Sequence, residues 1–135
     1  MKKSSINKIV IMAIILVLAV LFVRGFREPA VSMDGNKLII RSASGVTLNK
    51  SEINSMRLIT VIPTLTREGG FGVGTTQKGP VSSRDLGKGL AYVNWNNPPY
   101  IYLELNSDKG YVFLNLYNAD DTQVLYGSIR EWLQR

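Results

Sequence analysis

The side chains that carry most enzymatic chemistry are missing from this sequence. It contains no histidine and no cysteine, which removes Ser-His-Asp and Cys-His nucleophiles, thiol redox chemistry and the usual zinc ligand sets. A Ser-Lys dyad needs an S-x-x-K spacing, which occurs at Ser5 and Lys8 beside an apolar run, where contact with lipid headgroups is the simpler interpretation. We therefore expect a protein that is not an enzyme and has no catalytic residues, no metal site and no cofactor.

Carboxylates offer the remaining route to acid-base catalysis. Folding would have to bring two of them together to form a glycosidase pair. They are scattered over predicted turns and strand faces, where solvated surface positions are the simpler interpretation: Glu52, Glu68, Asp85, Glu104 and Asp108. A small hydrolase acting on envelope material remains the second alternative function, and it would require a cleft with two convergent polar side chains.

A glycine-rich segment at residues 69–74 resembles a phosphate-binding loop only in composition. Gly74 and Gly79 have the glycine spacing of a Walker A loop, but Pro80 follows where that loop needs a lysine. A dinucleotide fingerprint needs a third glycine where this chain has Gln77. The segment therefore predicts no nucleotide site, and glycines at this density in a strand region indicate bulges or tight bends.

A charge-free apolar run from Ile9 to Val23 lies near the N-terminus. As a helix it spans about 22 Å, less than the roughly 30 Å of the hydrocarbon core. Flanking residues can extend it, with Lys8 and Arg24 reaching the headgroups. The alternative is a cleaved secretory signal, but the small-x-small triplet at residues 30–32 lies well beyond the run. We predict an uncleaved, single-pass anchor in the cell membrane.

The basic charge of the chain belongs mostly to this anchor. The net charge is +6, but the first 24 residues hold four basic and no acidic residues, so twelve basic and ten acidic residues leave the remainder at +2. A surface for a polyanion would be more basic, so we expect no nucleic-acid partner. Lys2, Lys3 and Lys8 precede the run, and the positive-inside rule then places the soluble domain on the extracytoplasmic side.

The hydrophobic pattern divides the chain into four parts. We expect a basic tail at residues 1–8, a transmembrane helix at 9–24, a linker at 25–33 and one domain at 34–135. Period-two alternation and turn residues in that domain predict short strands, at 37–41, 45–48, 56–62, 90–95, 100–105 and 111–116. The last three are expected to form an antiparallel meander. A helical turn is expected at 51–53.

The C-terminus changes to a helical period. Asn118 is a suitable N-cap, and Leu125, Ile129 and Trp132 recur at helical spacing. We predict one amphipathic helix whose apolar stripe covers an open end of the sheet. The alternative is that this stripe binds a partner.

Several local motifs resemble the bacterial pleckstrin-homology-like (PH-like) domain family. They are residues 48–53 running into 56–58, then 71–74, 87–93 and 98–103, and the resemblance covers nearly all of 34–135. It implies a mainly β fold, a PH-like antiparallel barrel closed by one C-terminal α-helix, and frequent membrane attachment, but no established ligand or activity. The loop at 42–45 has only Arg41 and Lys50 near it, so no phosphoinositide site carries over.

Two surfaces of the domain are candidates for binding a partner. One is the glycine-rich hairpin from Arg67 to Arg84, with Phe71 near its tip. The other is a tyrosine face, on which Tyr100 and Tyr102 point away from their apolar neighbours, with cross-strand aromatic pairing as the structural alternative.

The leading prediction is a membrane-anchored, non-enzymatic binding or scaffolding module that recognises a protein or peptide. The first alternative is an anionic-lipid surface sensor that uses four cations: Arg67, Lys78, Arg84 and Lys88.

Overall fold

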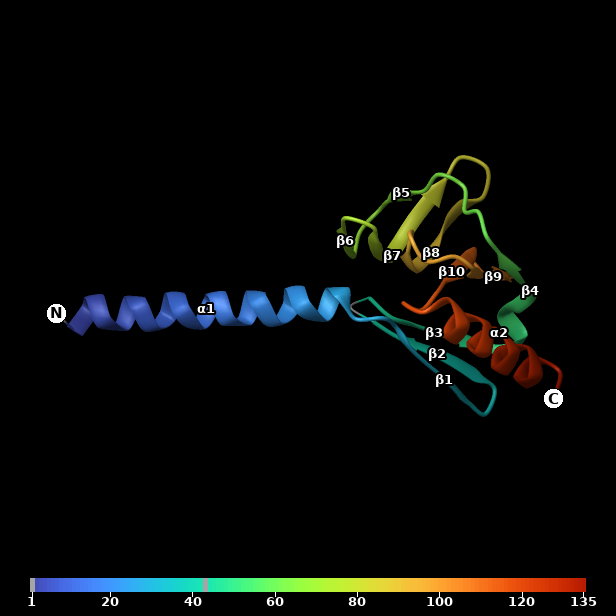
Figure 1. Cartoon of the computed structure of the whole chain (residues 1–135), viewed down its shortest axis with the longest axis horizontal. Coiled ribbons are helices and arrows are strands. Elements are labelled where there is room, and N and C mark those ends of the chain that lie inside the picture. Colours follow the sequence, from blue (N-terminus) through green and yellow to red (C-terminus); the bar gives the residue numbers. More distant parts are fainter. Residues whose placement is uncertain (1, 43) are drawn as a thin grey trace.

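A long N-terminal helix projects from a β-rich domain (Figure 1). The computed structural model describes residues 2–42 and 44–135. Helix α1 (Lys2–Phe26) exposes large apolar side chains such as Ile9, Met12 and Leu16, and none of its segment Lys3–Leu21, of mean hydropathy 2.4, is buried. It is long and apolar enough to cross a membrane, a property that a signal sequence shares. The predicted apolar helix is thus confirmed, and it is longer than 9–24 because the basic tail continues it.

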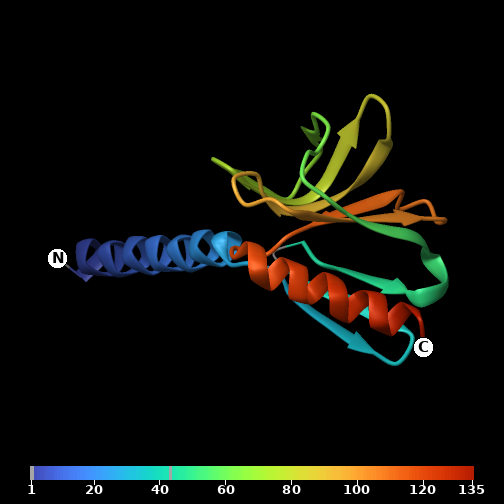
Figure 2. The same cartoon turned by 45° about the vertical axis from the view of Figure 1, so that its right-hand side comes forward.

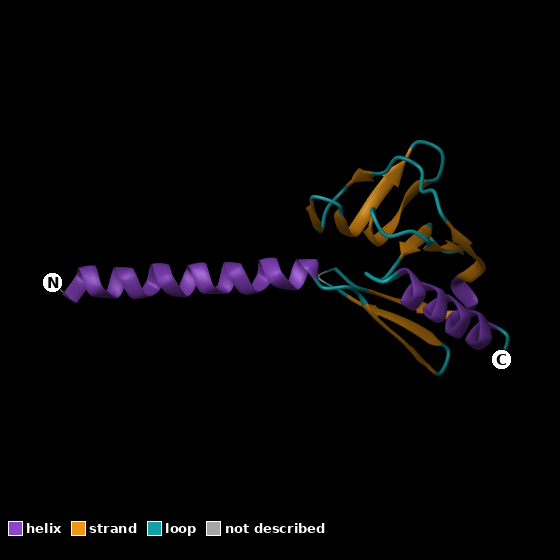
Figure 3. Ribbon diagram, in the orientation of Figure 1, coloured by secondary structure: helices purple, strands orange, loops and turns teal. Residues whose placement is uncertain are grey.

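The domain consists of short strands followed by one helix (Figure 3). Predicted strands 37–41 and 100–105 match the observed bounds residue for residue. The expected helical turn is present one residue earlier than predicted. The elements are β1 (Ala30–Asp34), β2 (Lys37–Arg41), β3 (Val46–Asn49), the 3-10 turn η1 (Lys50–Glu52), β4 (Ile53–Ile59), β5 (Thr66–Arg67), β6 (Phe71–Val73), β7 (Thr76–Ser83), β8 (Gly87–Asn94), β9 (Tyr100–Leu105), β10 (Tyr111–Leu114) and α2 (Ala119–Leu133).

The first three strands form an antiparallel sheet in the order β1-β2-β3. Val31 pairs with Ile40, and Leu38 pairs with Leu48. Because side chains alternate across a strand, Leu38 and Ile40 share one face, and both are fully buried. The predicted linker at 25–33 is shorter in the structure, at residues 27–29, because α1 continues to Phe26 and β1 occupies Ala30–Asp34. β1 completes a hairpin with β2 through the turn at Gly35.

The remaining strands form a larger sheet in the order β4-β9-β10-β8-β7-β5, with β6 added on β7. β9 and β10 form an antiparallel hairpin, but β10 then pairs with β8 in parallel, with Val112 opposite Leu90. The predicted meander is therefore wrong, because β10 lies between β8 and β9. Alternating apolar residues specify which face of each strand is buried, but they do not specify which strands pair, because backbone hydrogen bonds can join any two of them.

Each face of the larger sheet has its own apolar cluster. One face packs Ile101, Leu103 and Val112 against the smaller sheet and α2. The opposite face gathers a mainly aromatic cluster: Val81, Ala91, Val93, Tyr100, Tyr102, Tyr111 and Phe113. Ile59 at the end of β4, Ile62 and Leu65 of the β4–β5 connection, and Trp95 pack against this cluster. Burial on both faces explains why β9 and β10 are apolar at nearly every position.

Helix α2 lies along the open side between the two sheets (Figure 2). Ile129 and Trp132 are buried in the cluster shared by the sheets, and the indole N–H of Trp132 donates to the carbonyl of Gly35 at 2.8 Å. The predicted covering role of this helix is therefore confirmed. Within residues 2–42 and 44–135 no strand pairing closes either sheet into a barrel, and the β8–β10 pair departs from the expected wholly antiparallel arrangement.

Removing the N-cap of α2 provides a first test of this fold. The side chain of Asn118 accepts the backbone N–H of Asp120 at 2.8 Å and that of Asp121 at 3.4 Å. We expect Asn118→Ala to lower the free energy of unfolding by about 1 kcal/mol, because the first turn loses its acceptor. Urea denaturation of the full chain in detergent micelles measures this, and a loss below the error of the method would show that the cap is unimportant.

Candidate binding groove

The seven predicted surface residues occupy three different environments. Arg67, Arg84 and Lys88 are exposed, and Phe71 is half-buried in β6. Lys78, Tyr100 and Tyr102 are buried, so the expectation that they form an exposed surface is wrong. The two tyrosines belong to the aromatic cluster and are covered by the apolar side chains that pack on it, and Lys78 is buried within the domain.

The tyrosines pair across strands, as the structural alternative predicted. Tyr102 lies opposite Phe113 in the β9–β10 register, and their rings stack with centroids 5.0 Å apart. Tyr111 packs edge-on against Phe113 at 5.3 Å, and its hydroxyl donates to the carbonyl of Gly87. Burial raises the pKa of Tyr111 above its ordinary value. These rings form a fixed aromatic platform rather than a free recognition patch.

A groove of about 320 Å³ opens over this platform. Its walls come from the end of β4 and the segment after it, and from the β7–β8 turn. Two of its apolar side chains are exposed, Val61 at 79% and Leu86 at 40%. The lining residues are Arg57, Ile59, Val61, Pro63, Asp85, Leu86, Tyr102 and Phe113.

The groove carries one charge of each sign above its apolar floor. The guanidinium of Arg57 lies 5.2 Å from the centroid of the Tyr102 ring, a cation–π geometry. Asp85 lines the same groove from the β7–β8 turn. An aromatic floor with a few polar groups at the rim is typical of sites that hold organic ligands or peptide side chains.

An open sheet edge runs beside the groove. β4 pairs with β9 on one side and is the terminal strand of the larger sheet in the described part of the chain. Its alternate residues Arg57 and Ile59 line the groove, while Met56 and Leu58 pack on the other face. The backbone of an edge strand can accept a further strand. An extended segment added at β4 could therefore place a side chain in the groove.

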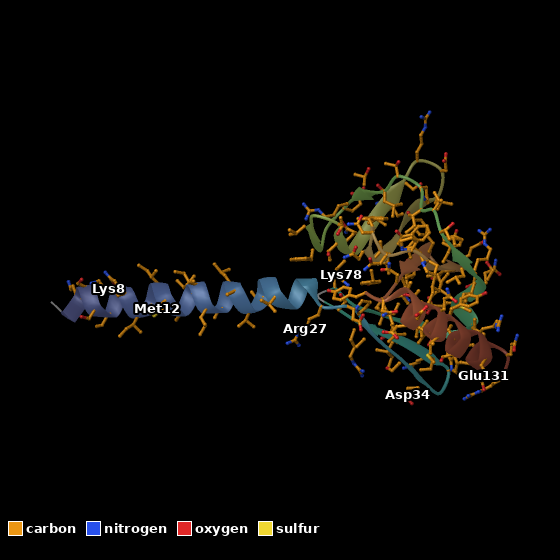
Figure 4. The ribbon with its side chains drawn as sticks, viewed as in Figure 1. Lys8, Met12, Arg27, Asp34, Lys78 and Glu131 are labelled. Carbon is orange, nitrogen blue, oxygen red and sulfur yellow. The ribbon has the colours of Figure 1, made fainter. Side chains whose placement is uncertain are left out.

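The buried amine of Lys78 lies at the end of the domain next to α1 (Figure 4). Its side chain is 1% exposed, and burial lowers its pKa to about 8, while the nearby carboxylate of Glu28 acts in the opposite direction. Glu28 also accepts the backbone N–H of Tyr117 at 2.9 Å. The carboxylate of Glu28 therefore ties the segment after α1 to Tyr117 and lies near Lys78 of β7.

The four cations proposed for lipid sensing are not gathered on one surface. Lys78 is inside the domain, whereas Arg84 and Lys88 flank the β7–β8 turn, at the end of β7 that points away from α1 (Figure 1). Acidic residues interrupt this region: Glu68, which accepts the hydroxyl of Ser82, and Asp85. The arrangement offers a mixed surface rather than a basic one.

A larger and more polar cavity, of about 640 Å³, opens at the far end of α2. Lys50 lies 4.8 Å over the ring of Trp132 there, and Glu131 pairs with Arg135 at 3.6 Å. Because the charges at this cavity already have partners within the domain, it gives less indication of a ligand than the groove does.

Of the eight residues that line the groove, the sequence prediction named Tyr102 as a surface candidate and Asp85 only as a solvated carboxylate, and it missed the others, among them Arg57, Val61 and Leu86. Their common feature in the sequence is only that they lie at or near strand ends. No cluster of three or more histidine, cysteine or acidic side chains suited to a metal ion is present in the residues that the structure describes.

No family model, curated protein or solved structure matches this chain. The geometry of the groove and the placement of α1 are therefore the basis for the function proposed below.

Proposed function

We propose that the chain is a membrane-anchored, non-enzymatic binding module that takes up an extended protein or peptide segment beside β4. The observation that carries this proposal is the open edge of β4 next to a groove with exposed apolar walls at Val61 and Leu86. Strand addition supplies main-chain hydrogen bonds, and the groove supplies side-chain selectivity. An apolar or aromatic residue suits the Tyr102–Phe113 floor, and Arg57 and Asp85 suit charged neighbours.

The proposed function includes membrane anchoring by α1 and a location for the domain on one side of the membrane. α1 holds the domain at the cell membrane in a single pass, and the basic residues that precede its apolar core favour the extracytoplasmic side for the domain. The proposal also includes the resemblance of the domain to the PH-like family, for which the argument is two sheets packed around a shared core with a C-terminal helix. The parallel β8–β10 pair is a departure from that family.

A peptide display library tests the groove directly. The full chain is placed in nanodiscs, selected against a library of random linear peptides, and compared with empty nanodiscs. We expect enriched peptides to bind at least about tenfold more weakly to Val61→Asp, a loss of about 1.4 kcal/mol, because a carboxylate would lie over the apolar floor.

Val124→Asp is the matched control, because Val124 is 69% exposed on α2 and does not line the groove. It should leave peptide affinity unchanged, and both variants should unfold at the urea concentration of the parent. Failure to enrich any peptide over empty nanodiscs, or equal affinity of the two variants, would contradict the proposal.

A further inference from the structure

The connection between α1 and the domain is short and held in place. α1 ends at Phe26 and β1 begins at Ala30. Within this connection Pro29 is buried, and the carboxylate of Glu28 accepts the Tyr117 N–H. The domain therefore cannot swing freely about the end of the helix, so one particular end of it faces any membrane that α1 enters.

Hydrogen bonds identify the loops at this end. Tyr117, whose N–H binds Glu28 of the connection, also accepts the side-chain amide of Asn97 at its carbonyl, at 2.8 Å. The β8–β9 turn therefore adjoins the connection. The backbone N–H of Trp95 donates to the carbonyl of Thr75 at 2.9 Å, so the β6–β7 turn adjoins that turn. Figures 1 and 2 both show β6 and the start of β7 on the side of the domain toward α1. We call these two turns, residues 71–76 and 95–99, the membrane-facing loops.

The composition of the membrane-facing loops suits the boundary between headgroups and acyl chains. Residues 69–77 and 89–103 contain no charged side chain. Val73 is 40% exposed at the β6–β7 turn, and Phe71 and Trp95 are half-buried. Aromatic and apolar side chains free of charge partition into this interfacial zone, and tryptophan is enriched there. Exposed Arg27 adds a cation at the end of α1, where lipid phosphates lie.

We propose that the membrane-facing loops form a second contact with the bilayer that α1 enters, with Val73 and the Trp95 turn resting in its interfacial zone. This inference rests on the membrane anchoring in the proposed function. The bilayer is the occupant because the surface continues directly from the end of the spanning helix. The contact fixes the tilt of the domain and leaves the β4 groove turned away from lipid.

The two tryptophans of the chain allow a matched test. Trp95 belongs to the membrane-facing loops, whereas Trp132 lies at the opposite end of the domain, next to Glu131 and near Asp34 (Figure 4). The full chain is reconstituted into vesicles of phosphatidylcholine, either plain or brominated near the headgroup end of one acyl chain. In Trp132→Phe, brominated lipid should lower the emission of Trp95 by about twofold, because the indole lies at quencher depth. In Trp95→Phe, the emission of Trp132 should not change.

A third variant, at Val73, tests the contact with the bilayer while Trp95 itself is unchanged. Val73→Asp, made in the Trp132→Phe background, should reduce the quenching of Trp95, while Val124→Asp in the same background should not. Equal quenching of Trp95 and Trp132, or no quenching of Trp95, would overturn the inference.

Flotation of the vesicles on a density gradient separates this inference from the anchoring. A chain that does not float with the lipid removes the anchoring and the inference together. A chain that floats while Trp95 is unquenched overturns the inference and leaves the anchoring intact.

Discussion

Replacing Asn115 with alanine is expected to lower the free energy of unfolding by about 3 kcal/mol, because three partly buried backbone groups lose their partner at once. Asn115 is 1% exposed. Its side-chain oxygen accepts the N–H of Asn94 at 2.8 Å, and its amide donates to the carbonyls of Asn94 and Asn97 at 2.9 Å each. Urea denaturation of the full chain in micelles, followed by tryptophan fluorescence, measures the loss.

Asn106→Ala provides the control for this prediction. Asn106 is exposed, and its amide donates to the carbonyl of Ser51 at 2.9 Å. Water can replace that bond, so we expect a loss below about 1 kcal/mol. Equal losses in the two variants would show that burial of the Asn115 network adds nothing to stability.

The Asn115 network also shows what alternation in the sequence can and cannot predict. The face of each residue in β9 was predictable, because Ile101 and Leu103 alternate with Tyr100 and Tyr102. Which strands lie next to each other in the sheet was not predictable, because the two-residue alternation is the same whichever strands pair. Asn115 bonds to Asn94 only because β10 lies beside β8, so its role depended on an order that the pattern leaves open.

β1 could have been found with one further step. Asp34-Gly35-Asn36 directly precedes the predicted strand at 37–41, and a tight turn of this kind joins two strands. Val31 and Met33 alternate on its other side and pack against the core. The sequence prediction missed this strand because only Ala30, Val31 and Met33 are apolar in it and it lies shortly after the long apolar run.

The groove depended on tertiary register. Arg57 lies over Tyr102 because the β4–β9 register places these two residues opposite each other, with a bulge near Ser55 that shifts the pairing. Asp85 and Leu86 reach the same groove from a turn almost thirty residues away in the sequence. Folding brings these residues together in space, so no local sequence pattern could predict that they share a groove.

Replacing Lys78 with methionine is expected to stabilise the domain at neutral pH by on the order of 2 kcal/mol, because a similar volume remains and the cost of burying an ammonium is removed. In the native chain, burial lowers the Lys78 pKa from 10.5 to about 8. Below pH 8 both the folded and the unfolded chain carry the charge, so the full penalty is present. Between about pH 8 and 10.5 the unfolded chain binds more protons than the folded chain, so stability rises with pH.

Urea denaturation in micelles at a series of pH values between 7 and 10 tests this sign. The parent should gain stability across that window, and Lys78→Met should not. Lys88→Met is the matched control, since Lys88 is exposed on the neighbouring strand and its removal should leave the slope of the parent. The rise is read most cleanly below about pH 9, because burial raises the pKa values of Tyr92, Tyr100, Tyr111 and Tyr117, and their opposite effect on stability begins as the unfolded phenols lose protons near pH 10.

Glu28→Gln then separates the effect of the nearby carboxylate from the effect of burial on Lys78. The carboxylate of Glu28 supports the charged form of Lys78, so its removal should lower the Lys78 pKa further and extend the rise in stability to lower pH. The glutamine side-chain oxygen can still accept the N–H of Tyr117, so the connection after α1 keeps its hydrogen bond. An unchanged pH profile in this variant would show that Glu28 holds the connection without stabilising the buried charge.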